Sequence, residues 1–379
     1  MDFIFTEEHE MIRQAARDYA ERELLKDVLE RDAKGEMPLE HVKNLTDLGF
    51  FGMMVNPEYG GGGMDTLSYV LAMEELSKAD AATSVILSVH NSLVCYGLEK
   101  YGSDFQKDKY LRPLATGEKI GAFLLSEPEA GSDASSQRTI GEDKGDHYLL
   151  NGTKNWITSA NLASVYLVIV QTHPDKKHRG INVLIVDKDS PGITLAPHED
   201  KMGMRSSDTH SVMFSDVKVP KENRIGDDGF GFTFAMRALE GGRIGIASQA
   251  VGIALGALER SIQYSKERKA FSKFISQHQA IAFKLSDMAV KIEASRNLVY
   301  KAAWLKDKGQ PYGIASAMAK QFAADSAMEI TTEAVQILGG YGYVKEYHVE
   351  RLMREAKLTQ IYEGTSEIQK IVISRSLLK

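Results

Sequence analysis

A glutamate near the C-terminal end of the chain stands where a helix is about to begin. The segment reads QIYEGTSEIQK, residues 360–370, and Glu363 lies between a tyrosine and a glycine. Ser366 and Gln369 have the spacing of a capping box, and an apolar run follows, so we expect the helix to start here. Acids usually lie inside the first helical turn, where the dipole stabilises them. Glu363 lies just outside that turn, beside Gly364, so its carboxylate needs another explanation.

Two segments in the middle of the chain combine polar groups with an aromatic ring. FLLSEPEAGSD, residues 123–133, follows a predicted strand, and backbone N–H groups in such a turn can bind phosphate or ring carbonyl oxygens. NWIT, residues 155–158, sets Trp156 close to a threonine hydroxyl, a combination that suits a flat, nitrogen-rich ring. Taken singly, an ordinary loop between strands and a core tryptophan are the commoner explanations.

Two segments in the C-terminal part could hold an anion. KERKAFSKFISQHQAI, residues 266–281, contains Arg268, and a guanidinium binds phosphate through a planar fork of donors. A solvated basic helix end explains the same residues equally well. QILGGYGY, residues 336–343, ends a predicted helix at two glycines, which either cap it or let a ligand approach the backbone.

Three zones of the sequence must position these groups. Apolar residues recur at the helical period up to about residue 118, short runs rich in β-branched and aromatic residues follow, and the helical period returns from about residue 229. The predicted fold class is therefore α+β and multidomain. We expect an N-terminal α-helical domain (1–118), a middle antiparallel β domain, barrel or sandwich (119–228), and a C-terminal four-helix bundle (229–379).

The first long helix of the C-terminal zone carries two glycine pairs. We expect a break or kink near Gly241 and Gly242. Gly252 and Gly256 are four residues apart, so they share a helix face and would let another backbone approach closely.

Composition excludes several classes of protein. A net charge of −6 argues against nucleic-acid binding, which needs a basic surface. Cys95 is the one cysteine of the chain, which excludes an intrachain disulfide and suits a reducing compartment. The most apolar stretch, residues 244–258, is too short to span a membrane, and the ten histidines form no metal-binding pattern. We expect a cytoplasmic protein without a bound metal.

The motifs SEPEAGSD, NWIT, ERKAF…HQAI, QILGGYGY and IYEGTSEIQ, in this order on a helix–strand–helix plan, resemble one family, the acyl-CoA dehydrogenases. The resemblance covers essentially the whole chain and is strongest to the bacterial short-chain, butyryl-CoA type. One departure is Ser272, which stands where the family usually has glycine after RKAF.

The resemblance implies an FAD cofactor between the β domain and the C-terminal bundle. Trp156 would cover the isoalloxazine ring, and Thr158 would bond near its reactive nitrogen. A second set of contacts would come from a neighbouring subunit, with Arg268 and Gln279 at the pyrophosphate and adenine region. The implied cofactor-binding residues are Phe123, Leu125, Ser126, Gly131, Ser132, Trp156, Ile157, Thr158, Arg268, Gln279, Gln336, Ile337, Gly339, Gly340, Thr365, Ser366 and Glu367.

The same resemblance implies the chemistry. Glu363 would remove the α-proton of an acyl-CoA thioester, while the β-hydride passes to flavin N5, giving a trans-2-enoyl-CoA. Substrate contacts would come from Ser132, Glu240, Arg243 and Gly364. Some family members carry the base one residue before the arginine that matches Arg243, and that position here is Gly242.

The implied partners follow from this reaction. Electrons would pass to electron-transfer flavoprotein, and cofactor contacts across subunits imply a homotetramer, a dimer of dimers. A bacterial cytoplasmic enzyme is expected ahead of the mature form of a mitochondrial matrix protein.

Two other functions stay open at this point. One is an acyl-CoA oxidase-like or divergent flavoenzyme of the same fold that uses oxygen or another activated acid. The other is a non-catalytic acyl-CoA-binding or assembly protein, which would not need the base or the flavin contacts.

Overall fold

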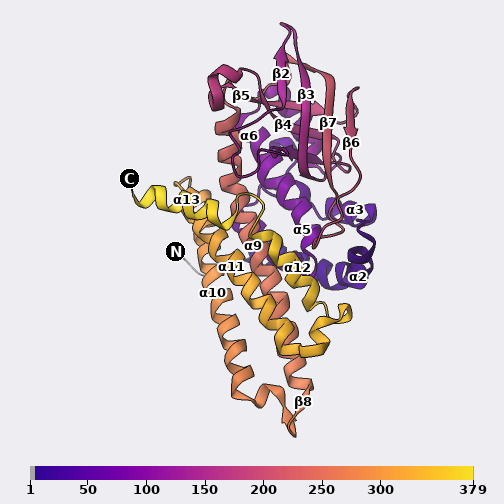
Figure 1. The fold of residues 1–379 in the computed structure, drawn as a ribbon, viewed down its shortest axis with the longest axis vertical. Coiled ribbons are helices and arrows are strands. Elements are labelled where there is room, and N and C mark those ends of the chain that lie inside the picture. The colour runs from indigo at the N-terminus through magenta and orange to yellow at the C-terminus, as the bar shows by residue number, and fades with distance from the viewer. Residues whose placement is uncertain (1–4, 379) are drawn as a thin grey trace.

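Helices, strands and helices again follow one another along the chain in the computed structural model, which describes residues 5–378 (Figure 1). This order confirms the predicted α+β class and its three parts. We propose that the domain boundaries lie between residues 118 and 119 and between residues 228 and 229.

The N-terminal part is helical, and the side chains with which it packs against the rest of the molecule are mostly buried. Its helices are α1 (Glu7–Tyr19), α2 (Leu25–Lys34), α3 (Leu39–Asp47), α4 (Thr66–Ala79), α5 (Ala81–Ser88), α6 (Tyr96–Tyr101), α7 (Asp104–Gln106) and α8 (Arg112–Ala115). A π-helical segment, Val89–Cys95, joins α5 to α6. Such wider turns are frequent at functional sites.

The middle part is one sheet of seven strands in the order β1-β4-β2-β3-β7-β6, with β5 paired to β4. The strands are β1 (Gly121–Leu124), β2 (Ile140–Asp143), β3 (His147–Thr158), β4 (Val165–Gln171), β5 (Ile181–Asp187), β6 (Ile193–Leu195) and β7 (Thr209–Pro220). Most pairings are antiparallel, as predicted. In addition, β1 and β2 pair with β4 in parallel, because the long connections between them let the chain return in the same direction.

The C-terminal part is built on α9, a continuous helix over Gly231–Glu267. The predicted break at Gly241 and Gly242 was wrong, since burial on several sides keeps the segment helical despite its low propensity. A hairpin of β8 (Lys269–Ala270) and β9 (Lys273–Phe274) follows. The other helices are α10 (Gln279–Asp307), α11 (Gly313–Leu338), α12 (Val349–Thr359), which was not predicted, and α13 (Ser366–Leu377).

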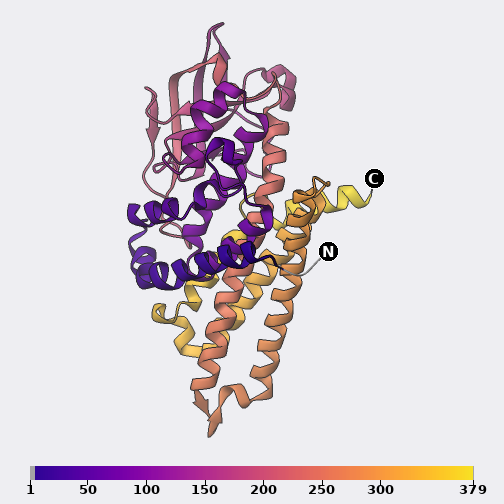
Figure 2. The same cartoon turned by 180° about the vertical axis from the view of Figure 1, so that it is seen from behind.

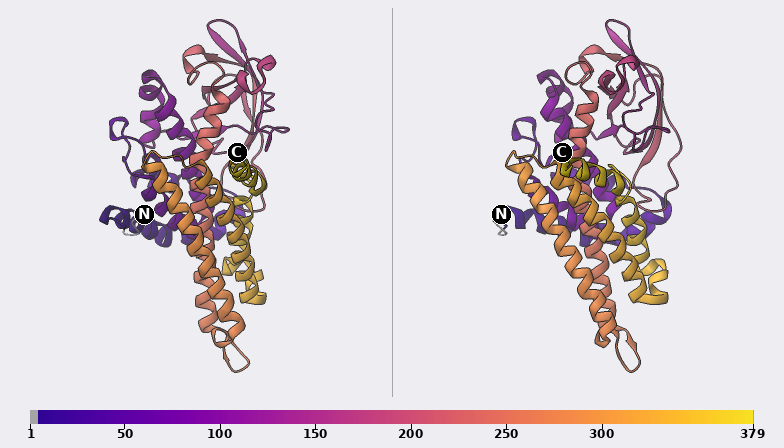
Figure 3. Two further views of the ribbon diagram at one scale, coloured as in Figure 1. Left: turned by 90° about the vertical axis from the view of Figure 1, so that its left-hand side faces the viewer. Right: turned by 60° about the vertical axis from the view of Figure 1, so that its left-hand side comes forward.

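The long helix α9 ties the molecule together. It runs from the sheet to the β8–β9 hairpin at the other end, and the N-terminal helices lie along its upper half (Figures 1 and 2). Its lower half packs with α10, α11 and α12 (Figure 3). A Cβ on Gly252 would lie 2.3 Å from the carbonyl oxygen of Glu74, and one on Gly256 would lie 2.5 Å from that of Lys78. The predicted close approach of another backbone is therefore confirmed.

Two helical stretches, Ala81–Tyr101 and Gly231–Glu267, are long and apolar enough to cross a membrane by length and composition alone. However, 94% of the apolar window in each is buried inside the protein, as in core helices.

Candidate active site

Glu363 lies in the short turn between α12 and α13. Its φ is 52° and that of Gly364 is 90°, so two consecutive residues are left-handed. For a residue other than glycine this conformation is uncommon, and it is typical of functional sites. The turn directs the carboxylate onto α9, where a Cβ added to Gly242 would lie 2.0 Å from Glu363 Oε2. Glycine at position 242 is therefore what leaves room for the carboxylate.

The carboxylate oxygens of Glu363 are buried, although the residue as a whole is half-buried. Neither of its oxygens has a hydrogen-bond partner among the described residues. Burial raises the pKa of Glu363 to about 7, against the opposing charges of Lys320 and Arg243. A carboxylate without partners and with a pKa near neutrality has the properties of a general base.

Two buried cations lie near this carboxylate. Arg243 is 6% exposed, one helical position after Gly242, and burial lowers its pKa. Lys320 of α11 is fully buried and donates from Nζ to the carbonyl oxygen of Gly364 at 2.7 Å. Arg243 was predicted for this site. Lys320 was missed, although a single lysine within the alanine-rich sequence of α11 was a usable signal.

Polar side chains close the space beside the carboxylate. Tyr362 donates to Gln249 Oε1 on α9, and Gln249 Nε2 donates to the carbonyl oxygen of Ala81 at 2.8 Å and to Ser84 Oγ at 2.7 Å. Leu93, from the π-helical segment, would come within 2.9 Å of a Cβ on Gly242. The segment over residues 84–94, from α5 into the π-helical turn, thus lies beside the base.

Glu240 lies one turn before Arg243 on α9 and is half-buried. A Cβ on Gly313 would lie 2.8 Å from Glu240 Oε1, so the carboxylate faces the start of α11. Ser132 is exposed in the loop after β1, and no hydrogen bond joins it to Glu363 within residues 5–378. The structure thus groups Arg243, Glu363 and Gly364, with Glu240 at the edge of the group.

The expected flavin-ring residues are held together by a buried ion pair. Lys154 Nζ lies 2.7 Å from Glu127 Oε1, and the two side chains are 0% and 2% exposed. The carboxylate also accepts from the backbone N–H groups of Arg138 at 2.6 Å and Thr139 at 3.0 Å. The backbone N–H of Asn155 donates to the carbonyl oxygen of Ser126 at 2.9 Å. The loop after β1 is thereby fixed against β3.

Trp156 is 63% exposed and left-handed, at a bulge between β3 and β7. The alternative of a core tryptophan is therefore wrong. Ile157 is buried beside it, and Thr158 is half-buried. Phe123 is buried at the end of β1, Leu125 and Ser126 are half-buried, and a Cβ on Gly131 would meet nothing within 4 Å. An exposed aromatic plane beside open backbone fits a flat cofactor ring.

The start of α13 differs from the sequence prediction by one residue. Thr365 is the N-cap, and its side chain accepts from the backbone N–H of Ile368 at 3.3 Å. The predicted capping box of Ser366 and Gln369 was wrong, because Ser366 is already helical and donates to Asp325 Oδ1 at 2.8 Å. Glu367 is exposed in the first turn. The helix still presents its N-terminal N–H groups next to the base, as an anion site requires.

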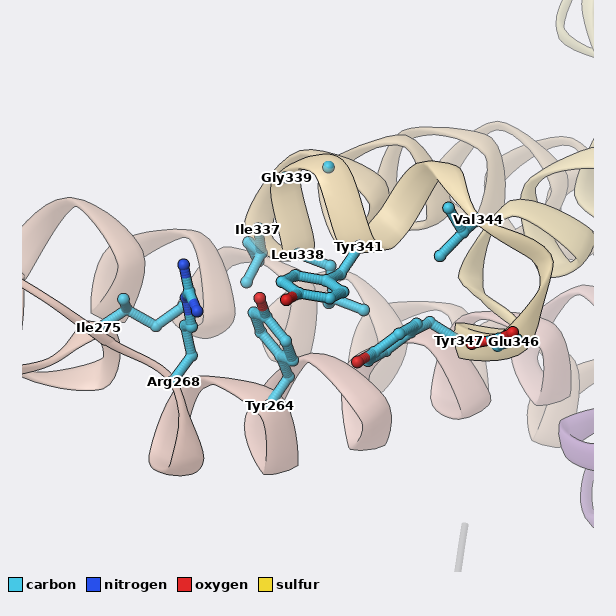
Figure 4. A pocket seen from close by; sticks show the side chains of 11 residues that line it. Tyr264, Arg268, Ile275, Ile337, Leu338, Gly339, Tyr341, Val344, Glu346 and Tyr347 are labelled. Carbon is cyan, nitrogen blue, oxygen red and sulfur yellow. The ribbon is translucent and has the colours of Figure 1, made fainter.

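A cavity of about 760 Å³ lies at the far end of α9 (Figure 4). Arg268 lies over the ring of Tyr341 at 5.6 Å, and Gly339 and Gly340 open the backbone on the same side. The lining residues are Tyr264, Arg268, Ile275, Ile337, Leu338, Gly339, Gly340, Tyr341, Val344, Glu346 and Tyr347. Gln279 and Gln336 are exposed and outside this lining. Ser272 takes φ 64° in the hairpin turn, the conformation that glycine would supply.

These two groups of expected FAD contacts lie towards opposite ends of the molecule. Trp156 belongs to the sheet, whereas Arg268 follows α9 at the β8–β9 end (Figure 1). The 37 residues of α9, about 55 Å of helix, run from the sheet end of the molecule to the Arg268 end. Since the two groups lie towards different ends of the molecule, the residues fit FAD when two chains contribute.

Comparison with known proteins gives matches along the chain. Family models described as the N-terminal, middle and C-terminal domains of acyl-CoA dehydrogenase match residues 6–118, 122–217 and 229–378. A short-chain specific acyl-CoA dehydrogenase of Clostridium acetobutylicum is 48% identical over 379 residues, covering 100% of both chains.

Two solved structures also match over the full length of the chain. Butyryl-CoA dehydrogenase of Megasphaera elsdenii superposes with a TM-score of 0.99 at 48% identity, covering 100% of each chain. A chain solved in work on the electron transferring flavoprotein of Acidaminococcus fermentans and flavin-based electron bifurcation superposes with a TM-score of 0.99 at 50% identity, also over 100% of each chain.

Proposed function

Because the chain belongs to the acyl-CoA dehydrogenase family, it is an FAD-dependent enzyme, and we propose that Glu363 is its catalytic base in the α,β-dehydrogenation of short-chain acyl-CoA thioesters. The observation that carries this assignment is the carboxylate itself. It is buried without partners against Gly242, at the position where a base on α9 would otherwise stand.

The chain's own groups divide the work as follows. Glu363 takes the α-proton, and the electron pair of that bond forms the α,β double bond of the trans-2-enoyl thioester. The backbone N–H of Glu363 has no backbone acceptor in the described part of the chain and is available to the thioester oxygen, where negative charge develops. Bound FAD supplies a hydride acceptor for the β-carbon.

Substrate and cofactor residues follow the same arrangement. Arg243, Glu240, Gly364 and Ser132 contact the acyl-CoA. The flavin end of FAD is held by Phe123, Leu125, Ser126, Gly131, Ser132, Trp156, Ile157 and Thr158. Its phosphates or adenosine contact the helix start at Thr365, Ser366 and Glu367. The other end is held by the neighbouring subunit through Arg268, Gln279, Gln336, Ile337, Gly339 and Gly340. The two-ended placement of these sets supports this division.

The preference for short acyl chains is supported by the contact of Tyr362 with Gln249. Gln249 lies two helical turns beyond Gly242 on α9, about 10 Å along the helix axis, and its contact with Tyr362 joins α9 to the turn that carries the base. We propose that this contact forms the end of the acyl site. The short-chain name of the Clostridium acetobutylicum relative agrees with this proposal.

Electrons leave to an electron-transfer flavoprotein, which the chain from the Acidaminococcus fermentans work supports. We propose a homotetramer, a dimer of dimers, in which each FAD site uses two chains. We also propose a cytoplasmic location in a bacterium, in keeping with the bacterial relatives and the unpaired Cys95.

An anaerobic titration of the purified yellow protein with acyl-CoAs of increasing chain length tests this function. Flavin absorbance should bleach fastest with butyryl-CoA. Glu363→Gln should keep its FAD but slow the bleaching by about 10²–10⁴-fold, the usual contribution of a general base. Glu118→Gln, which changes an exposed carboxylate, serves as the control. A Glu363→Gln protein that bleaches at the wild-type rate would remove Glu363 from the reaction.

A further inference from the structure

Lys320 is a fully buried lysine that forms no ion pair within residues 5–378. It lies on α11, and its ammonium donates to the carbonyl oxygen of Gly364 rather than to a carboxylate. Burial lowers the pKa of Lys320 to about 8, and Glu363 is the strongest opposing charge. A buried ammonium without an anionic partner is costly to keep, so its position calls for a reason beyond packing.

The bond from Lys320 fixes a strained turn. The Gly364 carbonyl also accepts from Gln369 Nε2 of α13 at 2.8 Å, so one oxygen receives donors from two helices. Glu363 and Gly364 are both left-handed, a combination that persists when the surroundings hold it. Gln369 provides a neutral donor to this carbonyl, and Lys320 provides a charged one.

The charge of Lys320 also acts on the base. The groups that face Glu363 are Lys320 from α11, Arg243 from α9, Tyr69 from α4 and the neighbouring Tyr362. Two positive charges favour the ionised carboxylate of Glu363, and that of Lys320 has a larger effect on its pKa than that of Arg243. Asp325 and Glu367 also act on Lys320, and Arg243 opposes its charge.

We propose that Lys320 is a positioning residue for the reaction: its ammonium holds the Gly364 carbonyl so that the Glu363 carboxylate stays against Gly242, and its buried positive charge favours the proton-accepting form of that carboxylate. This inference rests on the proposed role of Glu363. It assigns to α11 a task that none of the motifs around the site indicates.

Three variants separate charge from hydrogen bonding. Lys320→Met removes both, and Lys320→Arg keeps both. Gln369→Met removes the neutral donor to the same carbonyl and leaves the charge in place. Each variant is compared with the wild type for flavin content, thermal unfolding, and the rate of anaerobic flavin reduction by butyryl-CoA between pH 5.5 and 9.

The pH profile distinguishes the two roles. For Lys320→Met, we expect the pH at which the rate reaches half its maximum to rise by about one unit, as for loss of one nearby opposite charge. The deficit should therefore be at least about fivefold at pH 7 and smaller at pH 9. Gln369→Met should lower the rate equally at all pH values, and Lys320→Arg should restore the wild-type profile. A Lys320→Met profile with the wild-type midpoint would overturn the proposal.

A second measurement does not depend on turnover. The carboxyl band of Glu363, isolated as the infrared difference between the wild type and Glu363→Gln, is titrated with and without the Lys320→Met change. The midpoint should again rise. If butyryl-CoA does not reduce the wild-type flavin, the proposed function fails, while this titration still tests Lys320. If Lys320→Met does not fold, Lys320→Gln, a neutral donor, takes its place with the same expected shift.

Discussion

The Cα of Gly242 forms one wall of the space that holds the Glu363 carboxylate. A methyl group at this position would come 2.0 Å from Oε2 and 2.9 Å from Leu93 Cδ2, whereas a methyl group on Gly241 would have its nearest neighbour at 3.8 Å. Gly242→Ala should therefore displace the base and slow flavin reduction by roughly a hundredfold or more, since small misplacements cost that much. Gly241→Ala, on the same helix, is the matched control. Equal rates for the two variants would contradict this account of the site.

The raised pKa of Glu363 has a consequence for stability. Its pKa is about 7 in the folded protein against an ordinary value of 4.5, so the folded state loses stability as the pH rises from about 4.5 through 7. Glu363→Gln removes this penalty, which is roughly 3 kcal/mol at most. The melting temperature of the variant should exceed that of the wild type at pH 8, and the two should converge towards pH 5. A constant difference across this range would show that burial is not the cause.

Residue by residue, the sequence located groups that carry a motif and missed those that do not. Glu363 stands in an unusual place before a helix, so it could be singled out. Lys320 lies about 40 positions earlier in the chain and reaches the same turn only through the packing of α11. The N-cap was misplaced by one residue because Thr365 and Ser366 are both good caps, and the competing bond of Ser366 to Asp325 is tertiary.

Among the elements, β3 is fixed to the loop after β1 by the buried ion pair between Lys154 and Glu127. Lys154→Met leaves the Glu127 carboxylate buried without its charge partner, which typically costs about 3–5 kcal/mol. We expect a lower melting temperature and loss of FAD on gel filtration. Lys144→Met breaks an exposed pair with Glu142 on the same sheet and should cost less than about 0.5 kcal/mol. If both variants keep their FAD equally, the pair does not position the loop.

Elements with a regular pattern were predicted, and those set by partners were not. The strands with continuous apolar runs, β4 and β5, were found, whereas β6 is three residues long and exists by pairing with β7. In β7, alternation breaks between Phe214 and Val217, and the left-handed Asp216 explains that break. The unbroken α9 was missed because helix propensity argues against two glycines, and tertiary packing overrides it.

For the whole molecule, the separation of Trp156 from Arg268 predicts complementation between subunits. Arg268→Ala and Trp156→Ala chains should each bind FAD weakly on their own. In a mixed dimer purified with two affinity tags, one site combines an intact Trp156 with an intact Arg268, and the other combines both defects. Such a dimer should hold about one FAD per two chains by flavin absorbance. Retention of no FAD would mean that each site is built within one chain.

The order of helix, strand and helix was readable along the whole chain because each part keeps one period of hydrophobicity. The sequence did not show, however, that residues from these parts come together in one site. The site takes Gly242 from α9, Leu93 from the π-helical segment, Lys320 from α11 and Glu363 from a turn, and no local pattern states that these lie together.

The length of α9 limits which sequence changes this protein can accept during evolution. The same helix carries Gly242, against which the base lies, and ends at Arg268, which lines the cavity. Each added or deleted residue would turn one end against the other by about 100° and shift it by about 1.5 Å. Substitutions along α9 can accumulate wherever the packing allows them, but insertions and deletions cannot. Differences in length should instead collect in surface turns such as Pro174–Gly180, which carries no part of the site.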